Sequence, residues 1–299
     1  MKTTDPQTFL APLPKPLIDA AVRAALAEDL GLMGDITTAA TVPADAVAEA
    51  VIAARKPGVV SGCDVARTAF EIVDPETIFD AARADGSAVR PGDIIARIKG
   101  NARAMLTAER VALNFMGRMS GIATLTRRYA DAVAGTNARI VDTRKTTPGL
   151  RAFEKYAVRC GGGHNHRTGL FDAVLIKDNH IVAAGGIEQA IERARAAAGH
   201  MVKIEVEVDT MEQLDAVLRH KVDAVLLDNM SPDILKKAVK RVAGRCLTEA
   251  SGGVNLDTVP AIAATGVDMI SVGALTHSAP VLDIGLDFSP LKVRGKRPG

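Results

Sequence analysis

The stretch VKIEVEVDTMEQLDAVLRHKVDAVLLDNMSP, residues 202–232, holds a complete strand–helix–strand pattern. Its first apolar run, Val202 to Val208, alternates so that a lysine and two glutamates share one face of a strand. The capping-box pair Thr210 and Gln213 then predicts the start of a helix. A second apolar run follows from Ala224 to Leu227. This order favours two parallel strands that a helix connects.

Similar apolar runs recur through the last two thirds of the chain, and helical sequence fills the gaps between them. Strands that alternate with helices form parallel sheets, so the pattern favours an open (β/α) barrel of α/β class. A doubly wound open sheet is the alternative. The six runs are Ala138 to Val141, Ala173 to Ile176, Val202 to Val208, Ala224 to Leu227, Cys246 to Ala250 and Met269 to Val272.

The first third of the chain has a mixed pattern. Ala102 to Val133 indicates long helical sequence that Gly117 and Gly121 interrupt, and a domain boundary is expected near these glycines. The shorter elements expected before it are a helix from Leu17 to Leu30 and strands at Ala48 to Ala54, Val59 to Val60 and Ile94 to Ile98.

The composition excludes several classes of protein. A net charge of +2, 3 % aromatic residues and no Trp argue against a protein that binds nucleic acid. No run approaches the roughly 20 apolar residues of a membrane span, and the N-terminus lacks the apolar region of a signal peptide. Cys63, Cys160 and Cys246 are far apart and form no CxxC pair, so we expect reduced thiols in a cytoplasmic protein.

The predicted strands end in reactive or ligand-binding residue types. In either parallel architecture, ligands bind at the carboxyl ends of the strands. From Asp142 to His180, basic residues outnumber carboxylates, although the whole chain is nearly neutral. Later strands end in a carboxylate at Asp228 and in the small residues Ser251 to Gly253 and Gly273.

This distribution favours two anionic ligands. Arginine forks bind planar carboxylates in a bidentate manner, so several cations suit a polycarboxylate. Glu207 and Asp228 offer hard oxygen ligands for Mg²⁺, and glycine-rich strand ends suit a phosphate. A single charged residue at a strand end is usually a solvated loop residue. Several neighbouring strand ends that all carry charged or glycine-rich segments together support an active site.

The chain closely resembles the quinolinate phosphoribosyltransferase family, also called nicotinate-nucleotide pyrophosphorylases. The matching stretches follow one another in order along nearly the whole chain. They are GDITT (34–38), LTAERVALNFMGRMSGIAT (106–124), DTRKTTPGLR (142–151), GGGHNHRTGLFDAVLIKDNHI (161–181), EVEVD (205–209), LLDNMSP (226–232), EASGGV (249–254) and VGALTHSAPVLDIGLD (272–287).

The resemblance implies an N-terminal α/β sandwich domain, residues 1–118, and an open α/β barrel, residues 119–279. It implies that the C-terminal segment, residues 280–299, returns to the first domain. It also implies a homodimer in which the N-terminal domain of one subunit covers the barrel of the other. Arg110 is then expected to enter the partner's site.

The resemblance also implies roles for residues at the matching positions. Quinolinate is expected to contact Arg110, Arg144, His166, Arg167 and Lys177, and Lys145 is expected between the two substrates. The Mg²⁺ and phosphoribosyl side is expected at Glu207 and Asp228, with the 5′-phosphate at Ser251, Gly252 and Gly273 and His277 nearby.

The implied activity is phosphoribosyl transfer from phosphoribosyl pyrophosphate to quinolinate, with decarboxylation, in NAD synthesis. Its products are nicotinate mononucleotide, diphosphate and CO₂. A related protein of the same fold with another acceptor is the nearest alternative. A Schiff-base aldolase that uses Lys177 or Lys145 and a binding protein without catalysis are two further alternatives.

Overall fold

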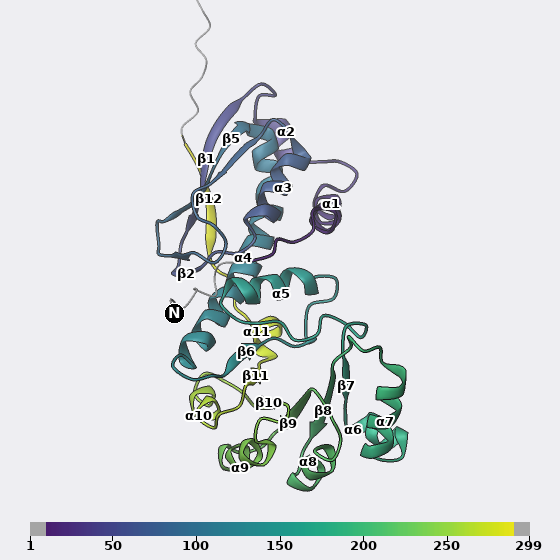
Figure 1. Cartoon of the computed structure of the whole chain (residues 1–299). Helices are drawn as coiled ribbons and strands as arrows, with labels where there is room; N and C mark the ends of the chain where they lie inside the picture. The colour runs from purple at the N-terminus through teal and green to yellow at the C-terminus, as the bar shows by residue number, and fades with distance from the viewer. Residues whose placement is uncertain (1–9, 290–299) are drawn as a thin grey trace, which may run out of the picture. The chain divides into compact units, whose positions relative to one another are not determined.

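The computed structural model describes residues 10–289 (Figure 1). The described residues divide into two compact units, of which the first contains residues 10–125, 159–162 and 279–289 and the second contains residues 126–158 and 163–278. The boundary expected between residues 118 and 119 stays a prediction. Of the segment expected to return to the first domain, residues 290–299 lie outside the described part.

The first unit is built on a four-stranded antiparallel sheet in the order β12-β1-β5-β3. Strand β12, from the end of the described chain, pairs with β1 from Ala50↔Phe288 to Ala54↔Ile284. The strands are β1 (Val47–Ala54), β3 (Ile78–Ala81), β5 (Ile94–Asn101) and β12 (Ile284–Phe288), and a separate pair joins β2 (Gly58–Val59) to β4 (Ala88–Val89). The first helices are α1 (Lys15–Leu30), α2 (Ile36–Thr41) and α3 (Cys63–Val73).

Helix α4 (Ala102–Ala132) is continuous, so the prediction that Gly117 and Gly121 interrupt it was wrong. The glycines are there because another segment lies against the helix. A Cβ atom at Gly121 would lie 2.0 Å from the carbonyl oxygen of Pro280, and one at Gly117 would lie 3.2 Å from that of Leu282. Glycine lowers helix propensity by about 1 kcal/mol relative to alanine, and the helix accepts this because residues 280–282 pack directly on its backbone.

The second unit contains a six-stranded parallel sheet in the order β6-β11-β10-β9-β8-β7. The first strand in sequence therefore lies beside the last, and among the described strands β6 and β7 do not pair. This order is that of an open barrel rather than a doubly wound sheet. All six predicted strands are present as β6 (Arg139–Val141), β7 (Val174–Ile176), β8 (Ile204–Val208), β9 (Ala224–Asp228), β10 (Leu247–Ser251) and β11 (Met269–Ser271).

Helices of the second unit follow the strands and pack on them (Figure 1). Contacts join α7 to β7, α8 to β8, α9 to β10 and α10 to β11. The predicted capping box is confirmed, because Thr210 Oγ1 accepts from Gln213 N at 3.2 Å. The helices are α5 (Arg151–Cys160), α6 (Asp178–Ala184), α7 (Ile187–Ala197), α8 (Met211–Val217), α9 (Pro232–Val242), α10 (Val259–Ala263) and α11 (Ala274–His277).

Both faces of the central strands are buried. In β9 the first four residues are buried, and in β8 the apolar residues and Glu205 are buried on opposite faces. Burial on both faces is expected of a parallel sheet that helices cover. Among residues 10–289, no helix combines the length and apolarity needed to cross a bilayer.

The contact at Gly121 gives a prediction with an unusual sign. Exposed helical Gly→Ala changes normally stabilise, but Gly121→Ala should lower the free energy of unfolding by about 1–3 kcal/mol, because the new methyl group would overlap the Pro280 carbonyl. Thermal melting measures the change. The control is Gly199→Ala, where a Cβ meets nothing within 4 Å. Equal or higher stability of Gly121→Ala would contradict the packing described here.

Candidate active site

A pocket of about 790 Å³ opens at the carboxyl ends of the parallel strands of the second unit. Eleven of the twelve residues expected in the site line it. The basic group consists of Arg144, Lys145, His166, Arg167 and Lys177. The other six are Glu207, Asp228, Ser251, Gly252, Gly273 and His277.

Arg110 is the expected site residue that does not line this pocket. It lies exposed on α4, within the first unit. The residues that line the pocket all come from the second unit, and Arg110 is not one of them.

Two arginines in the pocket have little compensation for their charge. The buried Nε of Arg144 has no hydrogen-bond partner among the described residues. Arg167 donates from Nη1 to the carbonyl of Ala173 at 3.3 Å. Burial, and after it the neighbouring charge of Arg144, lowers the pKa of Arg167. Two adjacent guanidinium groups that repel each other favour a ligand with more than one carboxylate.

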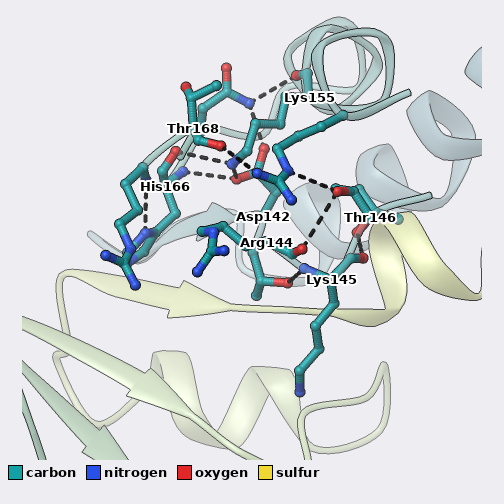
Figure 2. A network of polar contacts seen from close by, with 12 residues as sticks. Asp142, Arg144, Lys145, Thr146, Lys155, His166 and Thr168 are labelled. Carbon is teal, nitrogen blue, oxygen red and sulfur yellow. Dashed lines mark hydrogen bonds and ion pairs between the residues drawn. The ribbon is translucent and has the colours of Figure 1, made fainter. Parts of the chain in front are cut away.

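The carboxylate of Asp142, which directly follows β6, holds the chain segments that carry the basic residues of the pocket (Figure 2). This fully buried group accepts from Lys155 Nζ, from Asn165 Nδ2 at 2.6 Å and from the backbone N of His166 at 2.9 Å. Lys155 Nζ also donates to the carbonyl of His166 at 3.0 Å. Burial raises the pKa of Asp142 and lowers that of Lys155, and the attraction between the two charges opposes both shifts.

The backbone around Lys145 is fixed while its side chain is exposed. Its carbonyl accepts from Thr276 Oγ1 at 2.7 Å, and its N donates to Thr143 Oγ1 at 3.1 Å. Next to it, Thr146 Oγ1 accepts from Arg151 Nε at 2.9 Å. The Lys145 side chain extends away from this network (Figure 2). A fixed backbone with an extended ammonium group suits the binding of an anion at the pocket.

The carboxylates of the pocket lie at the ends of β8 and β9. Glu207 Oε2 forms an ion pair with Lys177 Nζ, and Asp228 Oδ2 accepts from Asn229 Nδ2 at 2.5 Å. Both are hard oxygen donors on neighbouring strands, so these residues fit Mg²⁺ that arrives with a phosphorylated substrate.

Two glycines line the pocket at positions where a side chain would meet neighbouring protein atoms. A Cβ at Gly252, whose φ is +90°, would lie 2.1 Å from Asn229 Oδ1. A Cβ at Gly273 would lie 3.1 Å from Lys145 Cδ and 3.3 Å from His277 Nε2. Glycine at these positions lets the backbone approach a ligand closely, as phosphate binding at strand ends requires.

His166 faces two buried glutamates that we did not predict as part of the site. Its Nε2 lies 2.9 Å from Glu205 Oε2 and 3.5 Å from Glu249 Oε2. Burial lowers the pKa of His166, while the hydrogen bond with Glu205 and the charges of Glu249 and Glu205 raise it further than burial lowers it.

Glu249 also lines the pocket. The sequence contained a signal for it, because residues two apart on a strand share a face and Ser251 was already expected in the site.

Family models cover most of the chain. The model for the quinolinate phosphoribosyl transferase N-terminal domain matches residues 35–120, and that for the C-terminal domain matches residues 122–287.

Individual relatives agree over nearly the full length. The carboxylating nicotinate-nucleotide pyrophosphorylase of Mycobacterium leprae is 48 % identical over 275 residues, which cover 89 % of this chain and 95 % of that protein. The chloroplastic protein of that name from Arabidopsis thaliana is 46 % identical over 287 residues, covering 90 % and 82 %.

Solved structures are similar as well. The crystal structure of NadC from Streptococcus pyogenes matches with a TM-score of 0.89 at 40 % identity, covering 93 % of this chain and 99 % of that one. The nicotinate-nucleotide pyrophosphorylase from Francisella tularensis matches with a TM-score of 0.90 at 38 % identity, covering 96 % and 100 %.

The buried pair of Asp142 and Lys155 gives a prediction about stability. Lys155→Met leaves a buried carboxylate without its cation and should lower the free energy of unfolding by about 3–5 kcal/mol. Asp142→Asn should also destabilise, and because both changes remove one interaction, the double variant should lose less than the sum. Denaturant unfolding measures all three.

The matched control is Lys203→Met. Its ion pair with Asp223 lies at 2.6 Å and is exposed, so its loss should cost less than about 1 kcal/mol. A similarly small effect of Lys155→Met, or additive losses in the double variant, would argue against the anchoring role of the buried pair.

Proposed function

The chain belongs to the quinolinate phosphoribosyl transferase family, and we propose that it transfers a phosphoribosyl group from phosphoribosyl pyrophosphate to quinolinate with decarboxylation. The products are nicotinate mononucleotide, diphosphate and CO₂. The observation that carries the choice of acceptor is the pair Arg144 and Arg167, adjacent cations in the pocket without an ion-paired carboxylate among the described residues.

The basic residues bind and orient the acceptor. Arg144 and Arg167 hold the two carboxylates of quinolinate, and His166 and Lys177 complete this half of the site. The ring nitrogen then attacks C1 of the ribose, and the C1–oxygen bond breaks as diphosphate leaves with the bonding electrons. Holding both anions in this orientation accounts for much of the rate gain.

The carboxylates act on the donor. Positive charge develops on the ribose as diphosphate leaves, and Glu207 and Asp228 stabilise it electrostatically. The ring nitrogen of the product is cationic, so the carbon–carbon bond to the adjacent carboxylate can break. CO₂ leaves without that electron pair, the pair remains on the ring carbon beside the positive nitrogen, and a proton then adds there.

Mg²⁺ is the proposed cofactor, held by Glu207 and Asp228. When bound, it supplies positive charge to the diphosphate oxygens. Lys145, whose exposed ammonium group extends at the same pocket, neutralises diphosphate charge from the protein side.

We propose a homodimer with shared sites. Arg110 is exposed on the first unit and does not line the pocket of the second, and we propose that it contacts quinolinate in the site of the partner subunit. The cytoplasm remains the proposed location, with Cys63, Cys160 and Cys246 as free thiols.

The other functions considered from the sequence fit the site less well. Lys177 forms an ion pair with Glu207, so its amine is held by a carboxylate, which fits an anion-binding residue better than a Schiff-base nucleophile. A binding protein without catalysis gives no reason to retain Glu207 and Asp228 at the pocket.

A single assay tests the proposal. Quinolinate, phosphoribosyl pyrophosphate and Mg²⁺ are incubated with the protein, and nicotinate mononucleotide and CO₂ are measured, with nicotinate as the control acceptor. We expect product from quinolinate only, and none after EDTA treatment. Product from nicotinate but not quinolinate would reject the proposed acceptor.

Removal of one arginine should weaken quinolinate binding. Arg144→Ala and Arg167→Ala each delete charge-assisted hydrogen bonds, so the quinolinate Kd from calorimetry should rise about 10- to 100-fold. Arg241→Ala is the control, because this exposed arginine on α9 binds Asp215. Unchanged affinity in both pocket variants would rule out the proposed carboxylate contacts.

Mixed dimers test the role of Arg110. Arg110→Ala and Lys177→Ala should each be nearly inactive, but subunits mixed after dissociation should recover about a quarter of wild-type activity, because half of the dimers then contain one intact site. Activity and heterodimer content, followed with two affinity tags, are measured together. No recovery in proven heterodimers would show that Arg110 does not act across subunits.

A further inference from the structure

Three buried ionisable side chains meet beside the quinolinate half of the pocket. Glu205 on β8 and Glu249 on β10 both face the ring of His166, and ligand atoms of the three lie within 4.8 Å of one another. Glu249 is 1 % exposed. No role proposed above for the reaction uses either glutamate, although Glu249 lines the pocket.

The protons of this cluster can be assigned from its hydrogen bonds. The Nδ1 atom of His166 accepts the backbone N–H of Arg167 at 2.8 Å, so it carries no proton. The ring therefore has its proton on Nε2, which donates to Glu205 Oε2 at 2.9 Å. The same bond from Arg167 opposes a second proton on the ring, because an imidazolium has no acceptor. The charge of Glu249 is one of the causes that raise the pKa of His166, and a protonated Glu249 removes it.

One proton from His166 is too few for two buried carboxylates. Among residues 10–289, Glu205 Oε1 and both carboxyl oxygens of Glu249 have no hydrogen bond of normal geometry. Ligand atoms of Glu205 and Glu249 lie within 4.8 Å of each other, and two buried carboxylates this close cannot both be ionised without a large cost in free energy. A proton on Glu249 removes one of the two charges and gives this unpartnered carboxyl a donor.

The surroundings of Glu249 place that proton on it. The pKa of Glu249 is raised to about 7, first by burial and then by the charge of Glu205. The charge of Asp142 also raises it, while the charge of His166 and the hydroxyl of Ser271 lower it. The charge of Lys155 acts on the neighbouring His166 and lowers the pKa of that ring. Near neutral pH this carboxyl therefore gains and loses a proton.

We propose that Glu249 is a positioning residue that acts as a carboxylic acid: its proton limits the negative charge beside the quinolinate pocket and leaves His166 as the neutral Nε2–H form that donates to Glu205. The identity of the ligand rests on the proposed function. Loss of this proton adds a negative charge next to a dianionic ligand.

The affinity for quinolinate should fall as the pH rises. Glu249 binds its proton more tightly in the folded protein than a free glutamate does, so the neutral form is present below a pH of about 7 and is lost above it. A ligand that needs the neutral form loses up to about tenfold in affinity per pH unit beyond that point. Quinolinate binding should therefore weaken as the pH rises from 6 to 8.5.

The experiment compares wild type with Glu249→Gln, which keeps the size and a hydrogen-bond donor but cannot ionise. The quinolinate Kd is measured by calorimetry and the quinolinate KM and kcat by assay, at several pH values. Between pH 6 and 8.5, the Kd and KM of wild type should rise by up to about 30-fold more than those of the variant, and kcat should change less. Glu212→Gln, an exposed glutamate on α8, is the control and should keep the wild-type slope.

Equal pH slopes in wild type and Glu249→Gln would overturn the proposal. So would tighter binding at higher pH together with sensitivity to EDTA, since that result means that the three side chains hold a metal ion.

Infrared difference spectroscopy of the wild-type protein covers the case in which the variant does not fold. A protonated carboxyl band should be present at pH 6 and absent at pH 8.5, and its absence at pH 6 would also overturn the proposal.

Failure of the proposed function has a different signature. If wild type binds no quinolinate at any pH, the ligand assignment is wrong, while the infrared band still reports whether Glu249 holds a proton. If quinolinate binds and the band is missing, the assignment of the ligand stands and the inference about Glu249 does not.

Discussion

The buried carboxylate of Asp142 is the group on which the cationic side of the pocket depends. It directly follows β6 and accepts hydrogen bonds from a side chain of α5 and from two residues of the segment that runs beside the strand. The loop with Arg144 and Lys145 begins directly after Asp142, and Arg167 directly follows His166, whose backbone N donates to Asp142. Two chain segments rich in cations would repel each other in isolation, and a shared buried anion holds both in place.

The side chains of the pocket differ in whether they have partners within the protein. Lys177 pairs with Glu207, and the ring of His166 donates to Glu205. For Arg144 and Arg167, no carboxylate lies within ion-pair distance among the described residues. The paired groups are held in place by the protein itself. If a dicarboxylate binds here as proposed, the two arginines gain their charged partners from it, and the free energy of forming those bonds contributes to binding affinity.

Much of the fold and of the site could be predicted from the sequence because both follow local rules. The six strands of the second unit alternate with helices along the chain, as their apolar runs predict. The carboxyl ends of parallel strands lie at the same edge of the sheet, and this does not depend on the sequence of the loops. The interruption of α4 was predicted wrongly because its glycines serve a contact with residues more than 150 positions away. Arg110 was placed by the resemblance alone, since no local pattern tells which residue serves another subunit.

The groups that surround them explain why two glutamates of the same site differ in chemistry. The register pairs Leu226 with Glu207 on one side and with Glu249 on the other, so both glutamates lie in one row across the sheet. Glu207 forms an ion pair with the ammonium group of Lys177. Glu249 faces another carboxyl and an imidazole whose proton is already donated, so burial favours its neutral form. One row of the sheet thus supplies both the partner of a cation and a carboxylic acid, and the difference arises from their neighbours rather than from the residue type.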